Sequence, residues 1–140
     1  MQLHRGRLLD HVHLRAKDLE ATKRFYREVL QAVGRADAIQ EDEQHLACDE
    51  LWIDRADGPV SHVHLAFRAA DREQVDAFHR AALAAGGRDN GAPGERKKYH
   101  PGYYAAFAFD PDGNNIEAVY HGPFKASAES VVITAEMPKG

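Results

Sequence analysis

The chain contains two copies of one sequence unit. Residues 10–34 (DHVHLRAKDLEATKRFYREVLQAVG) align without a gap on residues 63–87 (VHLAFRAADREQVDAFHRAALAAGG). Identical pairs include His11/His64, Asp18/Asp71, Phe25/Phe78 and Gly34/Gly87. Self-similarity at a fixed spacing is typical of a chain that repeats one supersecondary unit. The sequence therefore predicts two modules of the same fold that share a core.

Each copy reads as a strand followed by a helix. Apolar and polar residues alternate over Leu8–Ala16 and over His62–Ala69, which favours half-buried strands. Asp18 and Asp71 are placed to cap the next helix, and Gln74 completes a capping-box pattern in the second copy. Apolar residues then recur at helical spacing until glycines mark the helix ends.

The sequence after each helix predicts short strands. Candidates in the first copy are 45–48 and 51–54, preceded by a polar turn at 40–44; candidates in the second are 104–109 and 115–121, joined by the turn Asp110-Pro111-Asp112-Gly113-Asn114. Residues 88–101 are rich in Gly, Asn, Pro and Lys and are expected to form a mobile loop. Residues 131–135 are expected to be an added edge strand or a partner-contacting arm. The prediction is an α+β domain over 1–140, with module one at about 8–57, module two at about 61–122 and an extension at about 123–140.

Composition narrows the functional class. The 140 residues are 44% apolar and 29% charged with a formal net charge of −4, as in ordinary globular proteins. The longest basic run is Arg96-Lys97-Lys98, so we expect neither nucleic acid nor a membrane as partner. Cys48 is the only cysteine and is interpreted as a buried apolar residue. A lone cysteine and the lack of an apolar signal segment favour a cytoplasmic protein.

Two histidines and a glutamate are the candidate metal ligands. The repeat places His11 and His64 at the same position of the two first strands, on the face away from the helices. His13 and His62 share those faces but break the repeat, so they are ranked lower, as rim groups. Glu117 stands alone in an otherwise apolar strand and completes a two-histidine, one-carboxylate set. Such a set leaves cation positions open for water or substrate.

Three segments resemble one protein family. DHVHLRAKDLEATKRFYREVL, HLAFRAADREQVDAFHRAALAAGG and FAFDPDGNNIEAVYH are similar to the vicinal oxygen chelate superfamily of glyoxalases, bleomycin-resistance proteins and extradiol dioxygenases. The resemblance covers roughly residues 8–122. It implies paired βαβββ modules that form an open cup-shaped mixed sheet with helices on the outside. It also implies a divalent cation (Zn, Ni, Mn, Fe or Co) on His11, His64 and Glu117.

The resemblance suggests further site residues. Many glyoxalase-like members use a fourth ligand, and Glu50 resembles that position; it is otherwise a proton-transfer carboxylate or a solvated turn residue. Tyr104 is expected to face the cup and donate to a metal-bound oxyanion. His100 is expected to be an acid–base group at the same site.

The resemblance leaves three activities open. The first is a metal-dependent enzyme that chelates two oxygens of a small substrate, as a glyoxalase-like lyase, isomerase or related transferase. The second is an Fe(II) ring-cleaving dioxygenase, and the third is a metal-free drug-sequestering protein. We expect a homodimer for each of these activities. Whether one chain or two build the site stays open.

Overall fold

Two four-stranded sheets and two helices form the body of the computed structural model, which describes residues 2–5, 7–124 and 131–134. Its elements, in chain order, are β1 (Gln2–Arg5), β2 (Val12–Ala16), α1 (Leu19–Ala32), the 3-10 turn η1 (Ala36–Ala38), β3 (Ile39–Glu41), β4 (His45–Cys48), β5 (Leu51–Arg55), β6 (His64–Arg68), α2 (Arg72–Ala84), β7 (Arg88–Glu95), β8 (Tyr104–Phe109), β9 (Asn115–Tyr120) and β10 (Val131–Thr134).

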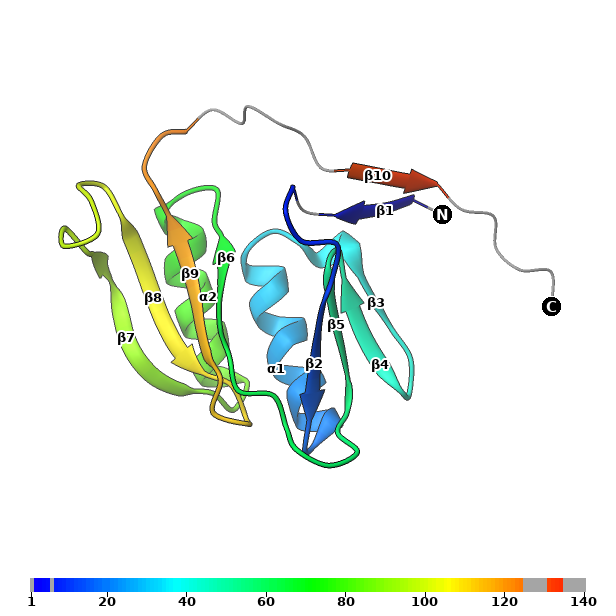
Figure 1. Ribbon diagram of the computed structural model, residues 1–140. Coiled ribbons are helices and arrows are strands. Elements are labelled where there is room, and N and C mark those ends of the chain that lie inside the picture. The colour runs from blue at the N-terminus through cyan, green and yellow to red at the C-terminus, as the bar shows by residue number, and fades with distance from the viewer. Residues whose placement is uncertain (1, 6, 125–130, 135–140) are drawn as a thin grey trace.

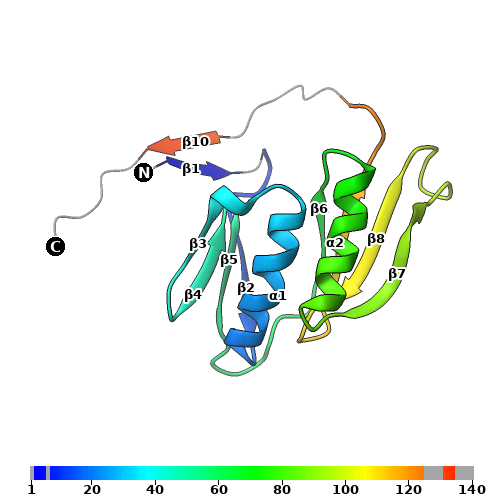
Figure 2. The same cartoon turned by 180° about the vertical axis from the view of Figure 1, so that it is seen from behind.

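The two sheets repeat the same strand order. Sheet one is β2-β5-β4-β3 and sheet two is β6-β9-β8-β7, each with one parallel pair at the crossover and antiparallel pairs elsewhere. Both are open sheets, and the predicted α+β class with βαβββ modules is confirmed. The helices lie behind the strands in Figure 1 and in front of them in Figure 2, so both sheets carry their helices on the same side of the molecule. The opposite face of each sheet is called here its open face.

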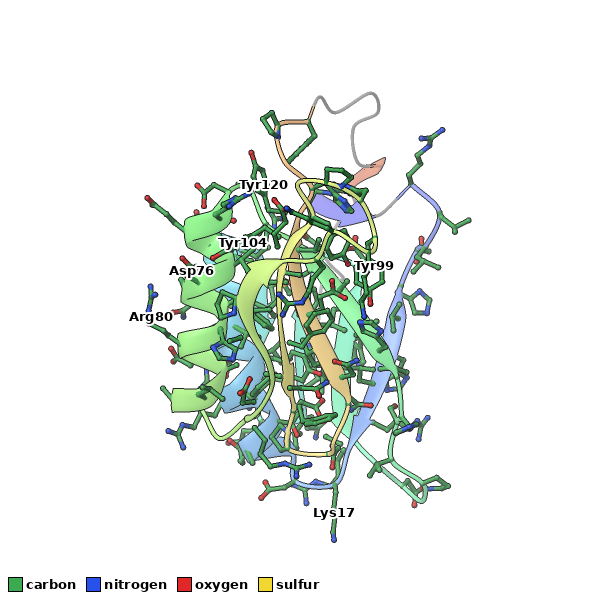
Figure 3. All side chains as sticks on the ribbon, turned by 90° about the vertical axis from the view of Figure 1, so that its left-hand side faces the viewer. Lys17, Asp76, Arg80, Tyr99, Tyr104 and Tyr120 are labelled. Atoms are coloured by element: carbon green, nitrogen blue, oxygen red, sulfur yellow. The ribbon has the colours of Figure 1, made fainter. Side chains whose placement is uncertain are left out.

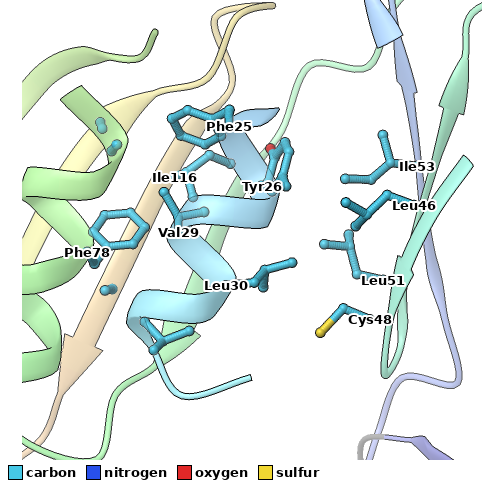
Figure 4. Close-up of a cluster of buried hydrophobic side chains, with 14 of the residues drawn as sticks. Phe25, Tyr26, Val29, Leu30, Leu46, Cys48, Leu51, Ile53, Phe78 and Ile116 are labelled. Atoms are coloured by element: carbon cyan, nitrogen blue, oxygen red, sulfur yellow. The ribbon is translucent and has the colours of Figure 1, made fainter. Parts of the chain in front are cut away.

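The core lies on the helix side of both sheets. Phe25 and Val29 of α1 face Phe78 and Ile116 of module two, while Leu30 faces the apolar side chains of sheet one (Figure 4). Phe25, Val29 and Phe78 are all fully buried. The first helix therefore packs against both modules, and burial of this shared apolar surface joins them into one body.

The predicted helix boundaries are confirmed by their caps. The Asp18 side chain accepts a hydrogen bond from the Ala21 N–H at 3.1 Å, and the Asp71 side chain accepts one from the Gln74 N–H at 2.8 Å. Gly34 follows α1 with a φ of +80°, a left-handed conformation that favours glycine.

Gly87 is required for a different reason. A Cβ there would lie 2.6 Å from Phe25 Cε2 and 2.7 Å from the Ala82 carbonyl oxygen. The repeated glycine therefore lets α1, α2 and the start of β7 approach each other, while its equivalent in module one allows a backbone turn.

The structure corrects the predicted loop at 88–101. Residues 88–95 form β7, an edge strand whose register with β8 shifts on both sides of Gly91. Edge strands tolerate glycine and proline because one side of the strand needs no ladder hydrogen bonds. The connecting loop is confined to 96–103. In module one, the first part of the expected turn at 40–44 belongs to β3.

The strands nearest the two ends of the chain, β1 and β10, pair with each other. β1 and β10 form an antiparallel ribbon in which Gln2 pairs with Thr134 and Arg5 with Val131. This ribbon lies beyond the ends of the sheet-one strands in Figure 1. The predicted β10 is therefore present, and Ala135 of that predicted segment lies outside the described residues. Among the described helices, none has the length and apolar character needed to cross a membrane.

Candidate functional site

Glu117 is a buried carboxylate on the open face of sheet two. It lies on β9, where Ile116 and Ala118 point to the core and Glu117 points the other way. Only 2% of the residue is exposed. Its Oε1 lies 2.8 Å from His64 Nε2, and its Oε2 accepts a hydrogen bond from the Tyr103 hydroxyl. A buried carboxyl group needs such partners because removal of its polar atoms from water is otherwise costly.

The strand register explains why His64 and Glu117 meet. β6 and β9 are parallel neighbours in which His64 pairs with Asn115, two residues before Glu117. Both side chains therefore point to the same face from adjacent strands. The His64 side chain is 52% exposed. The His64 imidazole is thus accessible to solvent, whereas the Glu117 carboxylate that it contacts is buried.

Tyr103 is a site residue that the sequence interpretation missed. The loop 96–103 ends with an Arg96 N–H donating to the Tyr103 carbonyl at 2.6 Å, which sets Tyr103 at the entry of β8. Burial raises the pKa of the Tyr103 phenol well above its usual value, and the hydrogen bond to Glu117 raises it further. Tyr103 therefore stays a neutral donor that orients the carboxylate.

Tyr104 does not face the open side, and that prediction is wrong. Its hydroxyl donates to Asp76 of α2 at 2.7 Å, and the Arg72 guanidinium lies 4.6 Å from its ring centre. In Figure 3, Tyr104 points toward α2 beside Asp76, while Tyr99 lies on the opposite side of the sheet. The alternation along β8 has the predicted period but the opposite phase, so Tyr103, Ala105 and Phe107 take the open face.

His100 lies at the border of this group. Its Nδ1 is 2.8 Å from the Pro101 carbonyl oxygen, which can only accept, so Nδ1 donates. In the neutral ring Nε2 then accepts from His121 Nδ1 at 2.9 Å. The His100 and His121 rings each lie near the ring of Tyr103, at 5.4 and 5.2 Å between centroids. The imidazole pair therefore packs against the ring of the residue that orients Glu117.

His11 lies apart from His64 and Glu117. It comes just before β2, is exposed, and its Nδ1 lies 2.8 Å from Asp10 Oδ1. Figure 1 shows β2 and β6 running in opposite directions, so their first residues lie at opposite ends of the molecule. Over the described part of the chain, no three His, Cys, Asp or Glu side chains converge on one point where a cation would fit. One chain thus brings together two of the three predicted ligands.

Glu50 does not hold the position equivalent to Glu117. In module two Leu65 pairs with Ile116, and in module one the equivalent Val12 pairs with Leu51. The residue that matches Glu117 is therefore Trp52, and Glu50 lies two residues before it, in the turn that precedes β5. The predicted equivalence between Glu50 and Glu117 is wrong, because the pairing of Val12 with Leu51 makes Glu50 the counterpart of Asn115 in module two.

Asp110 has a structural role in the turn Asp110-Pro111-Asp112-Gly113-Asn114 between β8 and β9. Its Oδ2 accepts from the Tyr26 hydroxyl at 2.6 Å and from Asn114 Nδ2 at 2.9 Å, and its Oδ1 accepts two turn N–H groups. The Asn114 side chain in turn accepts from the Val63 N–H at 2.7 Å. The motif therefore fastens the β8–β9 turn to α1 and to the start of β6, and so fixes the frame that holds His64 and Glu117.

The Cys48 thiol is not part of the site. It is buried, and burial raises its pKa to about 12. A thiol in this environment is a poor nucleophile at neutral pH. The interpretation of Cys48 as a core residue is confirmed.

The comparisons with known proteins agree with this architecture. The sequence model of the Glyoxalase/Bleomycin resistance protein/Dioxygenase superfamily matches residues 8–118. The chain belongs to this superfamily. The match covers both modules and includes His11, His64 and Glu117.

Solved structures of the superfamily share the fold. A glyoxalase/bleomycin resistance protein from Albidiferax ferrireducens T118 is 31% identical with a TM-score of 0.70, over 80% of this chain and 98% of that one. The oxidase ChaP-H1 is 25% identical with a TM-score of 0.59, over 81% and 95% of the two chains. Lactoylglutathione lyase from Agrobacterium tumefaciens is 22% identical with a TM-score of 0.57, over 81% and 93%. A search of curated proteins finds no match.

Proposed function

We propose that this chain is a divalent-metal-dependent enzyme whose metal site is shared by two copies of the chain. The observation that carries the proposal is the pair formed by His64 and the buried Glu117, oriented by Tyr103. Two ligands that bind one cation at about 2.1 Å each stand about 3 Å apart, and the His64 and Glu117 atoms are 2.8 Å apart. The donor set therefore fits a cation such as Zn, Ni, Mn, Fe or Co.

The third ligand is assigned to His11 of a second copy. His11 lies just before β2 of sheet one, the open face of sheet two carries the other two ligands, and the repeat makes His11 the counterpart of His64. A two-fold pair with sheet one of each copy facing sheet two of the other makes two equivalent cups. Each cup then contains His11 from one copy and His64 and Glu117 from the other. This arrangement has closed two-fold symmetry, as expected for a homodimer.

The proposed substrate is a small molecule with two neighbouring oxygens, and the proposed reaction is of the glyoxalase-like lyase or isomerase kind. A bound cation would supply Lewis-acid stabilisation of an anion that forms on such a substrate. The chain's own residues hold the ligand geometry: Tyr103 keeps its proton and orients Glu117, and His100 with His121 keeps Tyr103 in place. Retention of all three ligand types favours this proposal over metal-free drug binding. The buried, unreactive Cys48 fits the proposed cytoplasmic location.

The first test is the metal content of single variants. His64→Ala is expected to lose stoichiometric uptake, while His62→Ala is expected to keep it. His62 is the matched control because it is also exposed and lies two residues earlier with the same alternation. Equal metal in the two variants would contradict the assignment. Iron as the resident metal would favour an oxygenase, and nickel or zinc a lyase or isomerase.

The second test separates a shared site from a site within one chain. Differently tagged His11→Ala and Glu117→Ala chains are co-expressed and the mixed dimer is purified. Neither variant alone is expected to bind metal, but the mixed dimer contains one cup with all three ligands. It should therefore recover half of the wild-type metal content. A mixed dimer without metal would contradict the shared site.

A further inference from the structure

Trp52 is a partly exposed aromatic side chain that its neighbours hold in place. It is 40% exposed on the open face of sheet one. The His45 ring stacks on it with centroids 4.1 Å apart and planes 7° from parallel. Its indole N–H lies 3.3 Å from Asp54 Oδ2, while the other oxygen of that carboxylate is 2.7 Å from His13 Nε2. A stacked ring and a hydrogen bond at its edge fix the orientation of the indole.

The polar groups around Trp52 are themselves tied down. His45 Nδ1 lies 2.8 Å from Asp42 Oδ1, which anchors the ring beneath the indole. Burial raises the pKa of Asp54, but hydrogen bonds from His13 and Trp52 lower it more, so the carboxyl stays ionised as an acceptor. This arrangement costs rotamer freedom and leaves a large apolar ring in water. Fixed aromatic faces of this kind are what binding sites use for flat ligands.

The strand register pairs Trp52 with His13, two residues along the chain from the proposed metal ligand His11. Trp52 takes the position that Glu117 takes in module two, and His11 takes the position of His64. In module two the side chains at these positions are in contact. Standard strand dimensions put the Cα atoms of His11 and Trp52 about 8 Å apart, one strand across and two residues along. A single small molecule can therefore stack a ring on Trp52 and reach a cation bound to His11.

We propose that Trp52, stacked on His45, is the platform for a flat aromatic ring of the substrate, whose neighbouring oxygens reach the cation. The inference rests on the proposed function and names the substrate class for that same site. It assigns Trp52 to substrate recognition, and it assigns His45 and Asp54 to positioning of the indole. A saturated ring of the same size lacks the flat face and should bind less well.

The single tryptophan makes the proposal directly measurable. Trp52 is the only tryptophan in the chain, so indole fluorescence reports on this site alone. The probes are mandelate and hexahydromandelate, which carry the same neighbouring hydroxyl and carboxylate oxygens on an aromatic and a saturated ring. Each is titrated into the full protein loaded with Zn²⁺. Mandelate is expected to change the fluorescence of Trp52 and to bind about three- to tenfold more tightly than hexahydromandelate.

Variants separate the platform from general apolar contact, with affinities measured by calorimetry. Trp52→Leu should lose the preference for mandelate, Trp52→Phe should keep most of it, and His45→Ala should reduce it. Zinc content is measured in every sample. Full zinc with no preference, or with a preference unchanged by Trp52→Leu, would overturn the platform and leave the proposed function standing. Absence of zinc from the wild-type protein would overturn both.

Discussion

The two modules share one frame but carry different side chains on their open faces. On the helix side, β2 and β6 both present apolar residues to the core, and both helices begin at a capping aspartate. On the open side, the position next to the repeated histidine is Glu117 in module two and Trp52 in module one. Packing against the helices keeps the core faces alike, whereas the open sides share the repeated histidine and differ at the position next to it.

The turns that join the last two strands of each module differ as well. Module two uses a five-residue turn around the buried Asp110, and module one uses the short turn Asp49-Glu50, with Asp49 at a φ of +49°. The longer turn reaches α1 through Tyr26 and β6 through Asn114. In module two the turn is thus fastened to α1 and to the start of β6, whereas in module one Asp49 pairs with Arg35, which follows α1.

The largest expected effect tests this difference in the turns. Asp110→Ala removes the acceptor of four hydrogen bonds and leaves buried donors without partners. We expect a loss of about 3 kcal/mol in the free energy of unfolding. Urea titration followed by Trp52 fluorescence measures it. Asp112→Asn in the same turn is the control and should cost less than about 1 kcal/mol; equal losses would contradict a special role for Asp110.

A second prediction makes the two open faces alike. Trp52→Glu places a carboxylate beside His11, in the relation that Glu117 has to His64. If the two copies share the site, each cup gains a fourth ligand, and we expect metal affinity to rise about tenfold. Chelator competition measures the change. Trp52→Gln has nearly the same size without the charge and should leave the affinity near or below that of the wild type.

Sequence alone predicted most of the frame. Alternation, capping aspartates and terminal glycines located both helices and seven of the strands, because these signals act within a few residues. β7 was missed because glycine and proline are read as loop residues, and only pairing with β8 makes that segment a strand. The equivalence of His11 and His64 was visible from the repeat.

The site was harder to predict than the frame because it depends on register and on tertiary placement. Tyr103 and Tyr104 are adjacent aromatics at the start of β8, and alternation does not say which one faces the helix. Glu50 and Trp52 are two residues apart, so strand alternation assigns both to the open face of module one. Only the pairing of Val12 with Leu51 identifies Trp52 as the counterpart of Glu117. A repeat also does not show whether equivalent residues meet within a chain or between chains.

A third prediction concerns alkaline pH. Burial and Glu117 raise the Tyr103 pKa above its unfolded value of about 10. The folded state then holds this proton more tightly, so the stability it contributes is present below about pH 10 and is lost as pH rises through the folded pKa. Tyr103→Phe should therefore flatten the fall in stability between about pH 9 and pH 11, with Tyr26 and Tyr104 retaining part of it. Urea midpoints across this range measure the slope; an unchanged slope would contradict the assignment.

The last prediction concerns module one and leaves the proposed site unchanged. Cys48 should react with a thiol reagent about a hundredfold more slowly in the native protein than in urea, because the thiol is buried and its pKa is raised. Absorbance of the released chromophore measures the rate. Fast reaction in the native protein would show that the β4–β5 turn opens, in contrast to the turn of module two that holds Asp110.

The ribbon of β1 and β10 has a mechanical consequence. Its outermost pair is Gln2 with Thr134 and its innermost is Arg5 with Val131, so a force applied to the two ends loads the hydrogen-bonded pairs one after another. An antiparallel ribbon loaded in this way unzips, which takes far less force than shearing strands along their length. Under such a force β1 and β10 should therefore separate first. The distance between the two ends then increases while the two sheets formed by β2 through β9 stay folded.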